Sequence, residues 1–215
     1  MNTCFSQQIT RKNKLTSSVL ERYQSFIGTN KEVRQGLYQA LYNKTPVASG
    51  MYTDDKRTGM WHFYSKAGTL VENYNYDTNT LTYEAVEDTT SALRYFVDAP
   101  LNPGDRVTKP IKIGGRYFAY IPYLKLFKLP SDMPNTGREG YTITLELLIS
   151  PLGRLADFRI HVRLGKDEDI MHANTDLLLK DEDKQFIPAT LNNQPVACRI
   201  MIHCYLNPSD QIDMY

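Results

Sequence analysis

Alternating hydrophobicity in the last third of the chain is the feature that most limits how it can fold. From Tyr141 to Ile149, apolar residues alternate with polar ones, which is the period of a strand with one buried face. The sequence Ser150-Pro151-Leu152-Gly153 follows, and its proline and glycine suit a tight hairpin turn. Alternation resumes from Leu155 to Arg163. The sequence therefore predicts a β-hairpin with one buried face.

A third strand is predicted near the end of the chain, from about Pro195 to Leu206. The pair Asn192-Asn193 supplies the turn before it, because asparagine tolerates a positive φ. Alternation places one set of side chains toward the core: Cys198, Ile200, Ile202 and Cys204. It places the other set away from the core: Arg199, Met201, His203 and Tyr205.

This last strand is expected to be an exposed edge of the sheet. An exposed edge binds an extended partner through main-chain hydrogen bonds, while the outward side chains bias the choice of partner. Self-pairing of the same edge into a homodimer is an equally physical outcome. The candidate partner-binding residues are Arg199, Met201, His203 and Tyr205.

Two helices are expected around these strands. Between the hairpin and the last strand, Ile170, Ala173, Leu177 and Leu178 recur at helical spacing. Acidic residues at 167–169 suit the first turn of such a helix. A second helix is expected over 116–127, with Pro122 near its middle as a start or a kink.

A degenerate repeat occupies the N-terminal part of the chain. Gly36-Leu37-Tyr38 recurs as Gly59-Met60-Trp61, a shift of about 23 residues. Self-similarity at this period indicates successive hairpins, with turns at Asp54-Asp55-Lys56 and Ala67-Gly68. Tyr52, Trp61 and Tyr64 are interpreted as core residues. The alternative is that these aromatic side chains form an exposed binding surface.

Composition and motifs argue against several classes of function. The net charge is +1, from 25 basic and 24 acidic residues, so the chain lacks the excess of positive charge that is typical of proteins that bind nucleic acid or an anionic membrane. The histidines fall in separate segments, without cysteine or carboxylate ligands at metal-binding spacing. No Gly-x-Ser-x-Gly motif occurs, and the acidic residues at 167–169 lack the spacing of a calcium loop. The sequence therefore predicts no catalytic site, no metal site and no cofactor.

The cysteines and the first residues bear on the cellular compartment. Cys198 and Cys204 lie six residues apart on one predicted strand, too far to bridge, and are expected to be core thiols. There is no apolar run of transmembrane length. Cys4-Phe5-Ser6-Gln7 resembles the end of a signal peptide without its apolar part, so we hypothesise a truncated export signal.

From Gly114-Gly115 onward, over about 95 residues, the chain resembles the TonB C-terminal domain family. The matching features are Gly114-Gly115 with the aromatic helix after it, Pro130, Gly137-x-x-Gly140, Gly153-Arg154-Leu155, His172-Ala173, Phe186-Ile187-Pro188-Ala189 and Asn192-Asn193-Gln194-Pro195-Val196. Three positions depart from the family pattern: Leu129 replaces the usual Tyr, Phe186 the common Trp, and Asn193 the usual Gly.

This resemblance implies a location in the periplasm or cell envelope of a Gram-negative bacterium. It also implies binding of a protein or peptide, such as the N-terminal segment of an outer-membrane transporter, by edge-strand addition. The inner-membrane helix and long Pro-rich spacer of a true energy transducer do not occur in this sequence. The resemblance therefore does not imply coupling to the proton-motive force.

The N-terminal repeat resembles the MORN-type and antitoxin-like repeats over residues 34–83. The characteristic elements are Gly50-x-Tyr52, Lys56-x-x-Gly59-x-Trp61-x-x-Tyr64 and Gly68. Such repeats are found in many bacterial envelope proteins and have been linked to membrane lipids or protein partners.

Together, these patterns predict an α+β protein. An antiparallel β-hairpin repeat sheet precedes a small domain with a three-stranded antiparallel or mixed sheet packed on helices. The expected divisions are a disordered lead-in over 1–17, a repeat domain over 18–110, a TonB-like domain over 111–207 and a tail over 208–215. The expected function is non-enzymatic protein or peptide binding. The alternative is a scaffold that uses the aromatic repeat surface to bind a partner or glycan.

Overall fold

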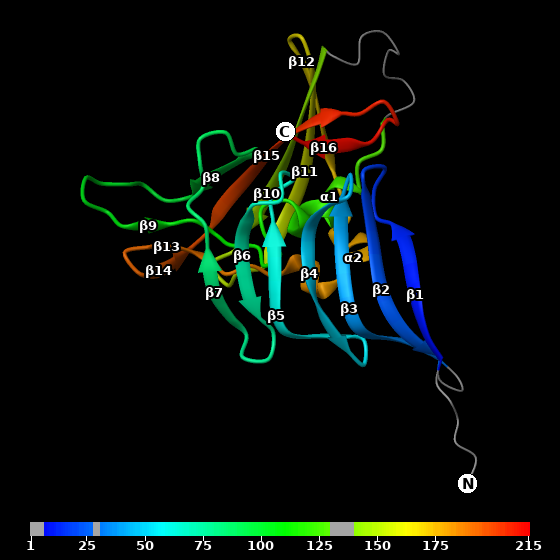
Figure 1. The fold of residues 1–215 in the computed structure, drawn as a ribbon. Helices are drawn as coiled ribbons and strands as arrows, with labels where there is room; N and C mark the ends of the chain where they lie inside the picture. Colours follow the sequence, from blue (N-terminus) through cyan, green and yellow to red (C-terminus); the bar gives the residue numbers. More distant parts are fainter. Residues whose placement is uncertain (1–6, 28–30, 130–139) are drawn as a thin grey trace. The chain divides into compact units, whose positions relative to one another are not determined.

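The protein is mostly β in a computed structural model, with 56% strand and 8% helix (Figure 1). The structure describes residues 7–27, 31–129 and 140–215. The described chain forms two compact units. The N-terminal unit comprises the residues up to Val86 together with Gly114–Ile121, and the C-terminal unit comprises Glu87–Ile113 and Pro122–Tyr215.

The N-terminal unit contains a seven-stranded antiparallel sheet in which each strand pairs with the next along the chain. Its strands are β1 (Gln7–Lys14), β2 (Val19–Ile27), β3 (Glu32–Tyr42), β4 (Thr45–Thr53), β5 (Lys56–Tyr64), β6 (Leu70–Asn75) and β7 (Thr80–Glu84). The predicted succession of hairpins is confirmed, as one continuous sheet. Asp54 and Asp55 form the β4–β5 turn at positive φ. The predicted disordered lead-in over 1–17 is wrong for Gln7–Lys14, because β1 pairs along its whole length with β2.

Aromatic side chains form the core of this unit on one side of the sheet. Trp61 and Phe63 are fully buried, and Tyr38 packs on Trp61 with ring centroids 5.3 Å apart. A Cβ added to Gly50 would lie 2.2 Å from the Trp61 ring, so only glycine fits there. Phe118 stacks on Phe63 from the short 3-10 helix Phe118–Tyr120. The interpretation as core residues is confirmed for Trp61 and for Tyr52 (6% exposed), whereas Tyr64 is half-buried.

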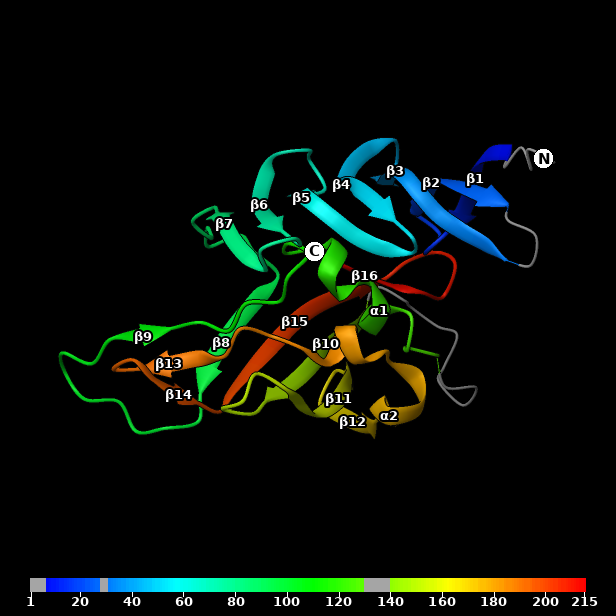
Figure 2. The same cartoon turned by 90° about the horizontal axis from the view of Figure 1, so that it is seen from below.

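The C-terminal unit is built on a six-stranded antiparallel sheet. Its strands are β8 (Leu93–Val97), β10 (Tyr141–Ile149), β11 (Leu155–Leu164), β12 (Asp167–His172), β15 (Cys198–Leu206) and β16 (Ile212–Met214). The order is β12-β11-β10-β15-β16, and β8 also pairs with β15. Figure 2 shows β15 between β8 and β10. A separate three-stranded sheet joins β9 (Val107–Thr108), β13 (Ala189–Leu191) and β14 (Gln194–Val196).

The predicted turns and buried face of this sheet are confirmed. Gly153 closes the β10–β11 hairpin at φ 70°, and its N–H donates to the Ser150 carbonyl at 2.9 Å. Asn192 and Asn193 form the turn between β13 and β14 at positive φ. One face of the large sheet is closed to solvent, including both cysteines. Its core residues are Ile143, Leu145, Leu147, Ile149, Phe158, Ile160, Val162, Cys198, Ile200, Ile202 and Cys204.

The helices are shorter than the sequence predicted. Residues 167–172 form β12, so a helix beginning there is wrong; only α2 (Thr175–Leu178) and the 3-10 helix Asp181–Lys184 follow. The physical reason is the two-residue turn Gly165-Lys166, which lets β12 pair with β11. In the predicted helix over 116–127, only Phe118–Tyr120 and α1 (Ile121–Leu124) are helical. Within the described ranges, no helix is long and apolar enough to cross a membrane.

The division of the chain differs from the boundary expected at residue 110. Residues 87–113 belong to the C-terminal unit, because β8 joins its large sheet and β9 joins its small one. Residues 114–121 belong to the N-terminal unit. The expected tail over 208–215 contains β16, whose three residues are buried.

Candidate functional site

Strand β15 is enclosed within its sheet, and the expectation of an exposed edge there is wrong. Residues 198–202 pair with β8 and residues 204–206 pair with β16, while β10 lies on the other side. The sequence did not reveal this because β8 comes about one hundred residues earlier in the chain. Edge-strand binding and a homodimer through the last strand therefore both lack the free edge that they require.

The four candidate side chains nevertheless share one surface. Arg199, Met201, His203 and Tyr205 lie on the side of the sheet opposite the core, as the sequence predicted. We call this side of the sheet the open face. Its residues on β8, β10, β11, β12 and β15, together with Asp98 just after β8, are Arg94, Phe96, Asp98, Thr142, Thr144, Glu146, Leu148, Asp157, Arg159, His161, Arg163, Glu168, Ile170, His172, Arg199, Met201, His203 and Tyr205.

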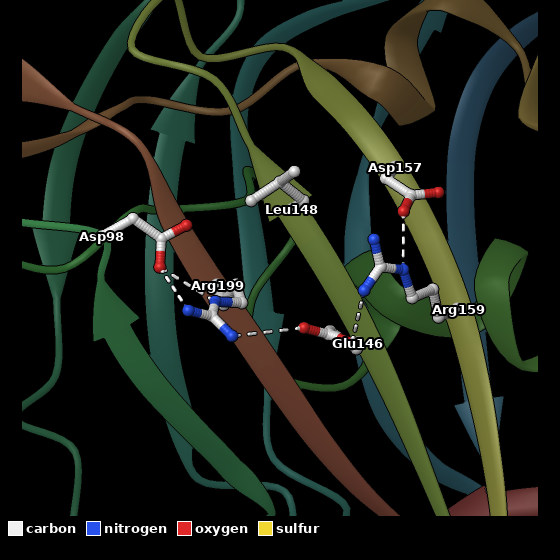
Figure 3. A pocket seen from close by; sticks show the side chains of 6 residues that line it. All are labelled: Asp98, Glu146, Leu148, Asp157, Arg159 and Arg199. Carbon is white, nitrogen blue, oxygen red and sulfur yellow. Dashed lines mark hydrogen bonds and ion pairs between the residues drawn. The ribbon is translucent and has the colours of Figure 1, made fainter. Parts of the chain in front are cut away.

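A row of alternating charges runs from Asp98, just after β8, across β15, β10 and β11 on the open face (Figure 3). Asp98 accepts hydrogen bonds from Arg199 at 2.6 and 2.9 Å. At the other end of the row, Asp157 accepts one from Arg159 at 2.7 Å. Glu146 lies between the two arginines, 3.7 Å from Arg199 and 3.8 Å from Arg159. The row therefore holds both guanidinium groups in fixed positions.

Burial and charge set the ionisation of this row. Burial alone would raise the pKa of Asp157, but the hydrogen bond and charge of Arg159 outweigh it and hold that pKa below its usual value. The hydrogen bond and charge of Asp98 raise the pKa of Arg199. Glu146 is almost completely buried and lies between the two guanidinium groups. The row contains three carboxylates and two guanidinium groups, so the acidic groups outnumber the basic ones by one.

Two neighbouring depressions lie on the open face. The first, of about 210 Å³, is lined by the five charged residues of the row and by Leu148 (Figure 3). The second is about 320 Å³. Its lining residues are Arg94, Phe96, Thr142, Thr144, His161, Arg163, Glu168, Met201 and His203. Phe96 is 54% exposed, which leaves an aromatic ring accessible beside Met201.

The histidines of the open face are held in polar contacts. His161 has one ring nitrogen 2.8 Å from Glu146 and the other 3.3 Å from Glu168. The ring of His203 lies 3.5 Å from the Thr144 hydroxyl. In the part of the chain that the structure describes, no group of three or more His, Cys, Asp or Glu residues could hold a metal ion. The face presents charged, hydrogen-bonding and apolar groups.

Sequence reasoning found the β10, β11 and β15 contributions to this face and missed those of β8 and β12. Alternation in Leu93, Tyr95 and Val97 was the available signal for β8 as a strand, but nothing local specifies its partner. For β12, the alternation of Glu168, Ile170 and His172 was the available signal, and the helical spacing of more distant apolar residues obscured it.

No protein-family model, no curated protein and no solved structure matches this chain. Two positions that contribute to the TonB resemblance, Pro130 and Gly137, lie outside the described residues.

Proposed function

We propose that this chain is a non-enzymatic binding protein that takes a protein or peptide partner on the open face of its C-terminal sheet. The observation that carries the proposal is the make-up of that face. It contains four arginines, Phe96, Met201 and Tyr205, and no lysine. Arginine, methionine and aromatic residues are enriched at protein interfaces, whereas lysine is depleted.

The order of the charged row also supports a binding surface. Arg159 and Arg199 are each held by an aspartate at hydrogen-bonding distance, so little side-chain entropy remains to be lost on contact with a partner. The two depressions adjoin along β10, β11 and β15 and can receive side chains from one partner surface.

A partner strand could add to this sheet at β12, and not at β15 as the sequence predicted. In the described chain, β12 pairs only with β11 and is an open edge of the sheet. A partner that lies over the second depression is therefore close to an edge strand as well, through Glu168. Addition of a partner strand to β15 itself would require β8 to leave.

The proposed setting is the cell envelope, where an outer-membrane transporter segment is one partner of suitable chemistry. This part of the proposal rests on the resemblance to the TonB C-terminal domain. The alternative, partner or glycan binding by the aromatic repeat surface, requires exposed aromatic rings. Trp61 is fully buried and Tyr52 nearly so, and no other observation favours that alternative.

The test is capture of envelope proteins by the immobilised full chain. Phe96→Asp places a charge at an exposed position of the open face, beside the second depression, and should abolish specific capture. Leu152→Glu is the matched control, because Leu152 is also exposed and lies in the β10–β11 hairpin turn. Both variants should keep the thermal unfolding midpoint of the parent. Capture that is unchanged by Phe96→Asp would contradict the proposal.

A further inference from the structure

Charges are segregated between the two sides of the seven-stranded sheet. A continuous row across the core side carries Glu21, Ala40, Ala48, Phe63, Glu72 and Glu84 in register. Glu32, the remaining carboxylate of these strands, bonds the buried Ser25 and is also on the core side. The opposite side, which we call the outer face, therefore receives no carboxylate from strands β1–β7.

The outer face carries cations instead. Its central row runs through Lys12, Arg22, Gln39, Ser49, His62, Asn73 and Tyr83. Lys14 and Lys56 lie on the same side, opposite Leu20 and Thr53. All four cations of this face are exposed, and in residues 7–27, 31–129 and 140–215 none of them makes an ion pair.

Exposed apolar side chains accompany these cations. Leu37 and Met51 are directly paired on the outer face, and both are more than 40% exposed. Met60 is exposed on the same face, and methionine adapts readily to a partner surface. A basic face with an exposed apolar centre calls for a partner that is both acidic and apolar.

A segment of the C-terminal unit has this complementary chemistry. Residues 166–184 contain seven acidic and three basic residues. Asp176 and Asp181 are almost fully exposed, although both approach Lys184, at 3.2 and 3.7 Å. Between them along the chain, Leu177 is 82% exposed and Leu178 is 56% exposed. The segment therefore presents carboxylates and leucines together.

We propose that the chain self-associates head to tail, with the outer face of one copy docking on residues 166–184 of a second copy. The two surfaces are different, so the contact is heterologous, and it builds rings or open chains of copies. The outer face is a different surface from the open face. Residues 166–184 share Glu168, Ile170 and His172 with the open face, but the exposed carboxylates and leucines of 176–181 lie outside it, so the inference does not depend on the function proposed above.

Sedimentation velocity of the full chain, at low and high salt and over a range of concentrations, tests the proposal. The parent should associate at low salt and dissociate toward monomers at high salt, because surface charges drive the contact. Lys12→Glu/Arg22→Glu should weaken association about ten-fold or more, as like charges then face each other. Asp176→Lys/Asp181→Lys should have the same effect.

Mixing the two double variants is the decisive arm. At a concentration where each variant alone is monomeric, the equimolar mixture should associate, because each reversed surface then meets its new complement. The control is Arg106→Glu/Lys125→Glu, which changes net charge by the same amount as Lys12→Glu/Arg22→Glu, at exposed cations elsewhere. A monomeric parent at every concentration would overturn the proposal, as would a mixture that stays monomeric. A monomeric parent that instead sediments with phosphatidylglycerol vesicles would assign the outer face to a membrane.

Discussion

Leu93 of β8 lies directly opposite Ile202 of β15, and this pairing encloses the strand that the sequence marked as a free edge. Every backbone N–H of an enclosed strand faces a neighbouring strand, on one side or the other. The backbone of β15 is therefore already paired, and its side chains on the open face are the groups that a partner can contact.

Met201→Pro should destabilise the C-terminal unit by about 3 kcal/mol or more, because proline removes a ladder hydrogen bond from an enclosed strand. Ile170→Pro on β12 is the matched control. Leu164 and Asp167 flank the two-residue turn, and Ala173 N–H donates to the Phe158 carbonyl at 3.1 Å. With this alternation of hydrogen-bonded pairs between β11 and β12, the Ile170 N–H points to the open edge of the sheet. Losing that N–H to proline should therefore cost about 1 kcal/mol or less. Urea unfolding followed by circular dichroism measures both, and equal losses would contradict the topology.

Gly50→Ala should destabilise the N-terminal unit by about 3 kcal/mol, because the added Cβ would meet the buried Trp61 ring. Gly59→Ala is the comparison: its φ of 64° disfavours alanine by about 1 kcal/mol, but no atom lies within 4 Å of the added Cβ. Trp61 is the sole tryptophan of the chain, so its fluorescence during urea unfolding reports this unit. A Gly59→Ala loss as large as that of Gly50→Ala would argue against the packing at Trp61.

The stability of the N-terminal unit should fall as the pH drops from about 4.5 toward 2. The hydrogen bond from Arg11, helped by one from Ser25, lowers the pKa of Glu32 from 4.5 to about 2. A lowered folded-state pKa contributes stability above pH 4.5, and this contribution is lost as the carboxylate is protonated. Glu32→Gln and Arg11→Gln should each flatten this part of the pH profile of Trp61-monitored unfolding. A profile with the parental slope in both variants would show that this pair does not contribute.

Cys198 and Cys204 should resist thiol reagents while the chain is folded. Both are fully buried, and burial raises the pKa of Cys198 to about 11. In a Cys4→Ser variant at mildly alkaline pH, a chromogenic disulfide reagent should therefore react slowly, whereas two thiols should react at once in guanidinium chloride. Rapid labelling of either thiol in the folded state would show that the core face of β15 opens.

Local chemistry in the sequence specified turns and faces, whereas long-range pairing decided the architecture. The Ser150–Gly153 and Asn192-Asn193 turns were predictable because proline, glycine and asparagine suit particular φ values. The inward set on β15 was predictable from alternation alone. Neither signal could show that β8 covers β15, because no local preference encodes a partner about one hundred residues away.

The helix expected over 167–178 illustrates the same limit. Its apolar spacing suited a helix, but Ile170 and Leu177 are both exposed, so no buried stripe exists to stabilise one. Pairing with β11 decided the conformation of β12 instead. The open face was consequently predicted only in part: the four β15 residues were identified, while Phe96 and Asp98 were not.

Site-specific photo-crosslinking in intact cells tests binding at the open face most directly. A benzoylphenylalanine at position 96 replaces an exposed ring on that face, and one at position 152 replaces an exposed side chain in the β10–β11 turn. Binding at the open face predicts a discrete adduct from position 96, lost on Met201→Glu, and none from position 152. No adduct at position 96, or the same adduct from both positions, would contradict it.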